Sequence, residues 1–189
     1  MRFLSLGLLF LSTSVFANWQ LDNDASALHF ISTKNEHIAE VHTFDRLSGE
    51  LSKDGSLTIS IDLTSVNTMI PVRNTRMQEM LFNVSEYAQA SFSTQLPAEV
   101  MSMAVGESKQ MTQSGTLSLH GETAEVSFVV NVQRLNNTTI SAHTVKPSLV
   151  NASQFGLTAG VDALRKIAGL NSISYAVPVT FSVTLKQSQ

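Results

Sequence analysis

The sequence predicts an all-β protein, in which about eight strands form an up-and-down antiparallel β-barrel with one or two short helices. Three observations support this prediction. Several segments alternate apolar and polar residues at a period of two, which places the two kinds on opposite faces of a strand. The links between these segments are short and carry turn residues, as in Asp54-Gly55 and Asn136-Asn137. No linker, repeat or charge block divides residues 18–189, and one sheet of this size removes its exposed edges by closing.

The first strands are expected at 19–21 running on into 27–33, at 40–51 and at 57–63. The last of these is the clearest, because leucine and isoleucine alternate there with threonine, serine and aspartate. The following segment, 64–92, breaks the period of two and is the expected lid or mouth of the barrel. It contains an expected helix at 74–82, with Asn74 as its N-cap and with Met77, Met80 and Leu81 on one face.

Further strands are expected at 90–96, with an extension to 105 left open, and at 110–120, 124–132 and 139–145. A second amphipathic helix is expected at 161–168, where Gly169 ends it. The last strand is expected at 177–185. A barrel of eight strands is just wide enough for its own side chains or for one slim ligand. The two helices would therefore either seal a filled core or cover an apolar tunnel.

The N-terminus reads as an export signal, with Arg2, an apolar run over 3–16 and a cleavage site after Ala17. This run is too short to span a bilayer, so no transmembrane segment is expected. Cleavage leaves 172 of the 189 residues as one domain, 18–189, with 11 Lys and Arg against 15 Asp and Glu. That balance argues against nucleic-acid binding. The absence of cysteine excludes disulfides, and together with export it favours the periplasm, with secretion as the alternative.

The sequence shows no catalytic or metal-binding constellation. No pair of the five histidines has a spacing that brings both side chains to one ion on a helix or strand, so we expect exposed or rim positions for them, with His29 and His143 on the outer face. There is no G-x-S-x-G motif and no carboxylate pair in an apolar setting. We therefore expect no catalytic residue and no metal. A lipid-modifying enzyme that uses His120 or His143 stays open as an alternative.

A series of motifs follows one another through the whole mature chain. They are Trp19-Gln20-Leu21-Asp22 with 26–30, Phe44 with 47–51, the strand 57–63 followed by 64–68, the long element 73–92, the segment 115–121 and Phe155-Gly156-Leu157. In this order and spacing the chain resembles the YceI-like family of exported lipid- or polyisoprenoid-binding proteins. It departs from that family at Ala88, where proline is usual, at Gln154, where an acid is common, and at 161–170, where a loop is frequent.

The resemblance implies an extended, lipocalin-like barrel whose apolar interior holds a lipid and which has no catalysis and no cofactor. We expect an exported binding or carrier protein for a long isoprenoid lipid, either a prenylquinone or a polyprenyl chain. A ligand-free structural or stress-response barrel is the second alternative, and a homodimer is left open. The residues expected to line the cavity are Phe30, Met77, Leu81, Phe92, Leu117, Leu119, Phe128, Phe155, Ile167 and Phe181. Head-group donors are expected at Arg73, Asn74 and Arg76.

Overall fold

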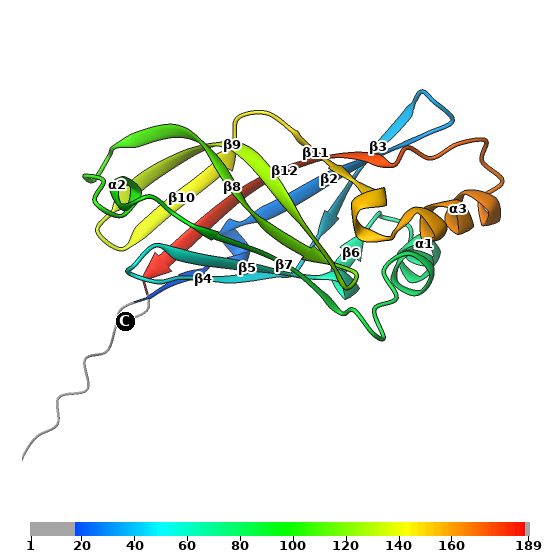
Figure 1. Ribbon diagram of the computed structural model, residues 1–189, viewed down its shortest axis with the longest axis horizontal. Helices are drawn as coiled ribbons and strands as arrows, with labels where there is room; N and C mark the ends of the chain where they lie inside the picture. Colours follow the sequence, from blue (N-terminus) through cyan, green and yellow to red (C-terminus); the bar gives the residue numbers. More distant parts are fainter. Residues whose placement is uncertain (1–17, 188–189) are drawn as a thin grey trace, which may run out of the picture.

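The computed structural model describes residues 18–187, and the expected export signal at 1–17 lies outside this part of the chain (Figure 1). The strands are β1 (Trp19–Leu21), β2 (Ala27–Lys34), β3 (Ile38–Phe44), β4 (Leu47–Leu51), β5 (Ser56–Asp62), β6 (Val66–Asn67), β7 (Gln89–Gln95), β8 (Ser108–Leu119), β9 (Glu122–Asn136), β10 (Thr139–Thr144), β11 (Ser148–Asn151) and β12 (Ala176–Gln187). The helices are α1 (Pro71–Arg76), α2 (Ala98–Met101) and α3 (Thr158–Ile167), with shorter helical segments η1 (Asn23–Ala25), η2 (Leu63–Ser65), η3 (Met77–Leu81) and η4 (Ala152–Phe155).

The strands form one antiparallel sheet that closes where β1 and β2 pair with β12. Four pairs of consecutive segments act as single bent strands: β1 with β2, β3 with β4, β5 with β6 and β10 with β11. Together with β7, β8, β9 and β12 they make eight barrel strands, each next to its neighbour in sequence. The predicted closed up-and-down barrel of about eight strands is confirmed.

Several predicted boundaries are wrong. The expected strand 40–51 is divided at Asp45-Arg46 into β3 and β4, whereas the segments expected at 19–21 and 27–33 are confirmed as β1 and β2, with η1 between them. The extension of 90–96 to 105 is wrong, because Pro97 ends β7 and α2 follows. The first helix begins at Pro71, which suits the first turn of a helix, and continues as the π-helical segment η3. Asn74 is therefore not its N-cap. The second helix begins at Thr158 rather than 161.

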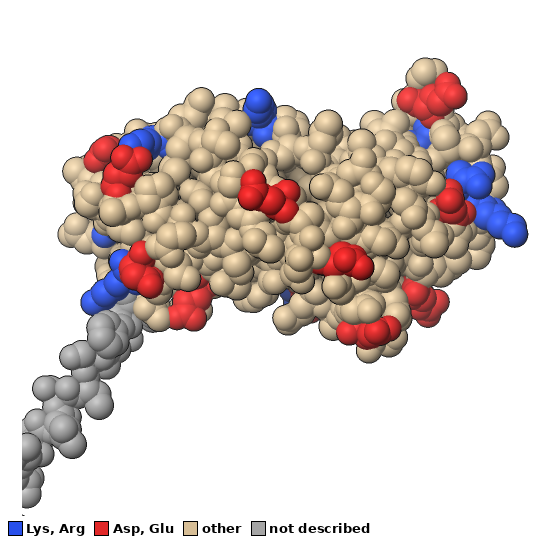
Figure 2. Space-filling view, in the orientation of Figure 1, with Lys and Arg blue, Asp and Glu red and all other residues tan. Residues whose placement is uncertain are grey.

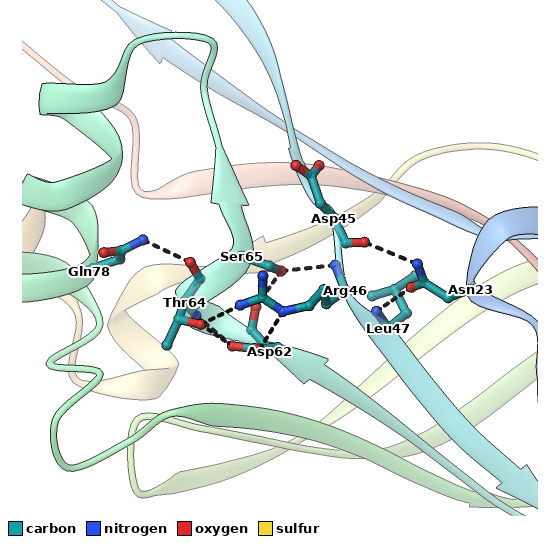
Figure 3. Close-up of polar contacts among 8 residues, drawn as sticks. All are labelled: Asn23, Asp45, Arg46, Leu47, Asp62, Thr64, Ser65 and Gln78. Carbon is teal, nitrogen blue, oxygen red and sulfur yellow. Dashed lines mark hydrogen bonds and ion pairs between the residues drawn. The ribbon is translucent and has the colours of Figure 1, made fainter.

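The bends of three neighbouring barrel strands lie side by side, and polar side chains satisfy the backbone groups that the bends release (Figure 3). Asn23 in η1 accepts a hydrogen bond from the Leu47 N–H at 2.7 Å and donates to the Asp45 carbonyl at 3.2 Å. The hydroxyl of Ser65 in η2 accepts from the Arg46 N–H at 3.0 Å. These contacts join the three bent strands at one level of the barrel.

Asp62, at the end of β5, lies at the centre of this polar cluster (Figure 3). It accepts hydrogen bonds from the Thr64 N–H at 2.9 Å and from Arg46 Nε at 2.8 Å, and Arg46 also donates to the Thr64 hydroxyl at 2.7 Å. Burial alone would raise the pKa of Asp62, but the hydrogen bonds from Thr64 and Arg46 outweigh it and hold the pKa below its ordinary value. Gln78 in η3 donates to the Thr64 carbonyl at 2.8 Å, which ties the helical end of the barrel to the same cluster.

Asp62→Ala is expected to lower the free energy of unfolding by about 1–2 kcal/mol, because it removes the cap of η2 and leaves Arg46 without its carboxylate. Equilibrium urea unfolding at neutral pH measures this loss. The control is Glu125→Ala on β9, whose side chain is exposed and which is expected to change stability by less than about 0.5 kcal/mol. Equal stabilities for the two variants would contradict a role for the cluster in holding the bends.

The two ends of the barrel are covered differently (Figure 1). At one end α2 and its flanks insert Leu96, Val100 and Met103, which are buried with Trp19 and Leu51. We call residues 96–103 the α2 plug. At the other end α1 and three segments that we call the helical cap, η3, η4 and α3, lie across the opening. No helix within residues 18–187 has the length and apolarity that a membrane crossing requires.

Candidate ligand-binding cavity

The barrel encloses a cavity of about 240 Å³ whose lining is apolar. It extends from Leu96 in the α2 plug to Leu81 and Val161 in the helical cap. One water molecule needs only about 10–15 Å³ of such space, yet an apolar cavity offers water no hydrogen-bond partners. Gln113 is the polar exception among the described lining residues, and its amide donates to the Thr94 hydroxyl and to the Ser114 carbonyl at 2.5 and 3.0 Å. The cavity therefore suits an apolar guest.

Aromatic rings line this cavity in two connected groups. Phe128 makes edge-to-face contacts with Phe92 and Phe181, with ring centroids 5.6 and 5.1 Å apart. Nearer the helical cap, Phe44 stacks on Phe30 at 5.2 Å and contacts Phe82 at 5.7 Å. Contacts of this geometry add to the energy of burial and fix the orientation of the rings. They give the cavity a defined shape along the length of the barrel.

The helical cap closes one end of the cavity through close backbone packing. Gly160 in α3 lies against η3 so closely that a β-carbon there would come within 2.7 Å of the Met80 carbonyl oxygen and 2.9 Å of the Leu81 α-carbon. Phe155 in η4 is fully buried, and Leu157 and Val161 are also buried among the lining residues. The two halves of the cap, 77–81 and 152–167, therefore meet over the end of the cavity.

Most residues expected in the lining do line the cavity: Phe30, Leu81, Phe92, Leu117, Leu119, Phe128, Phe155 and Phe181. Met77 is buried in the core but does not line the cavity. The expected position of Ile167 is wrong: it is the last residue of α3 and is 48 % exposed. The inward side of this helix is formed by Val161 and Leu164, and Ile167 lies beyond the barrel. That any of these residues contacts a lipid stays a prediction.

The lining also includes residues that were not singled out from the sequence. They are chiefly Leu28, Phe44, Leu47, Leu57, Ile59, Ile61, Val130, Val132, Val177, Val179, Val183 and Leu185. Each lies an even number of positions from another inward residue of the same or a continuing strand, so the period of two contained the signal.

The three residues expected to donate to a head group lie on α1. Arg73 donates to Glu40 on β3 and to the Thr68 carbonyl, both at 2.7 Å. The Asn74 side chain accepts from the N–H and the hydroxyl of Thr68, at 2.9 and 2.6 Å, so it fixes the chain before α1. The Arg76 side chain is half-exposed and makes no hydrogen bond or ion pair within residues 18–187. A role of these residues in binding stays a prediction.

The expectation that the histidines are exposed or at the rim is wrong for His42, which is 3 % exposed. It lies opposite Phe30 in the β2–β3 pairing, and its ring makes an edge contact with the Phe30 ring at 5.3 Å. Its Nε2 is 3.1 Å from the Ser32 hydroxyl. Burial holds the pKa of His42 below its usual range, and the Arg73 charge lowers this pKa further, whereas Glu40 raises it in part.

Within residues 18–187 the histidines form no metal-binding group with acidic side chains. His29 and His143 alternate with the lining residues Phe30 and Ala142 and so face outward, as expected. His120 lies in the turn after β8 with a positive φ of 55°, and its ring packs on Tyr87 with centroids 4.7 Å apart. This ring contact and the backbone turn describe a structural position for His120.

Known proteins resemble this chain in sequence and in fold. The model of the family described as YceI-like domain matches residues 19–185, which is almost the whole described chain. The chain belongs to the YceI-like family. Among solved structures it is similar to a polyisoprenoid binding domain from Saccharophagus degradans implicated in plant cell wall breakdown, with 42 % identity and a TM-score of 0.86. That match covers 90 % of this YceI-like chain and 98 % of the other chain.

Two more distant structures share the YceI-like fold. Burkholderia cenocepacia BcnA is 19 % identical with a TM-score of 0.64, and the match covers 87 % of this chain and 98 % of that one. The Campylobacter jejuni YCEI protein is 13 % identical with a TM-score of 0.53, over 78 % and 84 % of the two chains. No curated protein matches the chain. At these lower identities the likeness concerns the arrangement of the barrel alone.

Proposed function

We propose that this YceI-like chain is an exported, non-catalytic binding or carrier protein for a long isoprenoid lipid, and that it works in the periplasm. The observation that carries the proposal is the continuous apolar cavity along the barrel between the α2 plug and the helical cap. The polyisoprenoid binding domain that is 42 % identical over 90 % of this chain supports the same class of ligand.

Hydrophobic burial supplies the binding energy in this proposal. Each methylene group moved from water into the cavity contributes about 0.8 kcal/mol before the costs of association and ordering are subtracted. An isoprenoid tail carries many such groups and is slim enough for an eight-stranded barrel. On the face shown in Figure 2 the charged side chains are scattered, and neither sign forms a large patch. This favours an apolar tail inside the barrel as the partner over a charged polymer outside it.

The first test is analysis of the bound lipid. The protein is purified from its native host without detergent, and an organic extract is analysed by mass spectrometry. We expect an isoprenoid lipid in near-stoichiometric amount. An extract without any lipid would sink the carrier proposal and would favour a ligand-free barrel.

A matched set of variants tests where the lipid lies. Phe128→Trp and Leu119→Trp add bulk at the cavity wall and are each expected to lower lipid occupancy at least about threefold, because a filled site cannot accept the tail. Ser127→Trp introduces the same indole next to Phe128, but on the exposed outer face of β9, and is the control, with unchanged occupancy. Full occupancy in both inward variants would show that the lipid lies elsewhere.

A further inference from the structure

The inner wall of the barrel changes from apolar to polar where β2 and β3 run under α1. In their antiparallel pairing Phe30 is opposite His42 and Ser32 is opposite Glu40. Residues directly opposite each other project to the same face, as do residues two apart along a strand. Since Phe30 lines the cavity, the side chains of Ser32, Glu40 and His42 also lie on the inner face. An apolar wall thus continues into a polar one.

Helix α1 covers this polar section. Arg73 reaches from α1 to Glu40 on β3, and Lys34 on β2 makes a second ion pair with the same carboxylate, both at 2.7 Å. Arg73 also donates to the Thr68 carbonyl just before α1. The side chains of all three charged residues are about one quarter to one third exposed. Together with buried His42, which contacts the lining residue Phe30, they form a polar cluster that we call the niche.

Two nitrogen atoms in this niche are buried without a hydrogen bond to the described residues. They are Nδ1 of His42 and Nε of Arg73. The nearby Val41 backbone raises the pKa of His42 in part. Its position does not, however, meet the geometry of a hydrogen bond to Nδ1. A buried polar atom left unpaired costs about 1–3 kcal/mol, so such atoms in a native protein usually have a partner that is a water or a ligand.

Both atoms act as donors. Arg73 Nε carries a hydrogen at all relevant pH values. Ser32 can donate its hydroxyl hydrogen to His42 Nε2, 3.1 Å away, and the neutral ring then carries its own hydrogen on Nδ1. Burial favours this neutral ring by lowering the pKa of His42. The niche therefore offers donors to a ligand and needs acceptor oxygen atoms in return.

The charges already present point to an uncharged ligand group. The hydrogen bond from Lys34 lowers the pKa of Glu40, burial opposes this, and Arg73 lowers the pKa further, so the carboxylate is ionised at neutral pH. It lies between two cations and neutralises one of their two positive charges. A phosphate in the niche would face the Glu40 carboxylate and be repelled by it. A carbonyl oxygen would accept hydrogen bonds without that repulsion.

We propose that His42 and Arg73 form a head-group site that binds the carbonyl oxygen of an uncharged lipid head group, while the tail lies in the cavity beyond Phe30. This site rests on the proposed function, since it requires a lipid in the barrel. It adds a residue, His42, and a class of head group that the apolar cavity alone does not specify.

The test compares ligands that differ in the head group. The full mature protein is freed of lipid and titrated with a menaquinone bearing a geranylgeranyl tail, with geranylgeranyl monophosphate and with phytane, a branched hydrocarbon without a head group. We expect the quinone to bind about tenfold more tightly than phytane, as two added hydrogen bonds allow. His42→Leu and Arg73→Leu should each weaken quinone binding roughly three- to tenfold and leave phytane binding unchanged.

Controls and a second measurement separate binding from folding. His29→Leu, on the outer face of β2, and Arg165→Leu, on α3, are expected to bind all three lipids as the unaltered protein does. In the unaltered protein, the 15N signal of His42 Nδ1 should shift when the quinone is added, whereas the ring signals of His29 should not. This measurement does not depend on any variant folding.

The outcomes are distinct. Loss of quinone binding in both inner variants with a shifted Nδ1 signal supports the site. Equal binding of quinone and phytane, with no shift at His42, overturns the head-group site and leaves the carrier function intact. Tighter binding of the phosphate than of the quinone overturns the assignment to an uncharged head group. No binding of any of the three lipids overturns the carrier function and the site together.

Discussion

Phe155→Ala is expected to lower the free energy of unfolding by about 3–5 kcal/mol, the usual range for removing a buried phenylalanine. Phe155 is 0 % exposed and ends η4, from where it packs into the barrel interior. It borders an existing cavity, so neighbouring side chains cannot collapse into the space that its ring would leave. The full cost of the enlarged cavity therefore adds to the lost burial.

Equilibrium urea unfolding of the lipid-free protein measures this loss. Leu149→Ala is the matched control: Leu149 lies six residues earlier on β11, is 69 % exposed and is expected to cost less than about 0.5 kcal/mol. A bound lipid should recover part of the Phe155→Ala loss, since the tail fills the added space and binds only the folded state. A loss below 1 kcal/mol would mean that η4 is not part of the folded core.

Gly160→Ala is expected to destabilise the protein by about 1–3 kcal/mol, although alanine favours a helix over glycine by up to about 1 kcal/mol. The added methyl group would lie 2.7 Å from the Met80 carbonyl oxygen and 2.9 Å from the Leu81 α-carbon, both of which belong to the backbone of η3. Neither can rotate away as a side chain could. The substitution should therefore push α3 and η3 apart and loosen the helical cap.

Close packing and helix propensity predict opposite changes in the stability of Gly160→Ala. Ala159→Gly, at the neighbouring exposed position of α3, is the control and should cost about 0.5–1 kcal/mol through helix propensity alone. If propensity alone acted at Gly160, the alanine variant would gain a similar amount. Thermal and urea unfolding test stability, and the rate at which bound lipid transfers to empty vesicles should rise in Gly160→Ala if the cap retains the lipid. A stabilised Gly160→Ala protein would contradict the close packing.

The period of two was sufficient to predict the barrel and the named lining residues that lie on strands, because alternation along a strand is set by backbone geometry alone. It could not reveal the bends, since Asp62 and Asn23 act there through hydrogen bonds to residues of other strands. Ile167 was misplaced because the period of a helix gives a face but not the point where that helix leaves the barrel. His42 was missed because a polar residue at an inward position reads from sequence as an exposed one.

The α2 plug gives the cavity a fixed floor. Val100 and Leu51 are fully buried there, and Leu96 both belongs to the plug and borders the cavity. If a lipid tail occupies the cavity as proposed, it can extend only as far as this floor, while the proposed head-group site beneath α1 fixes its other end. The distance between the plug and the niche then acts as a ruler: a shorter tail leaves space empty, and a longer one must fold back or lift its head group away from His42. Changing the size of Leu96 would move the floor and should change the length of tail that fits best.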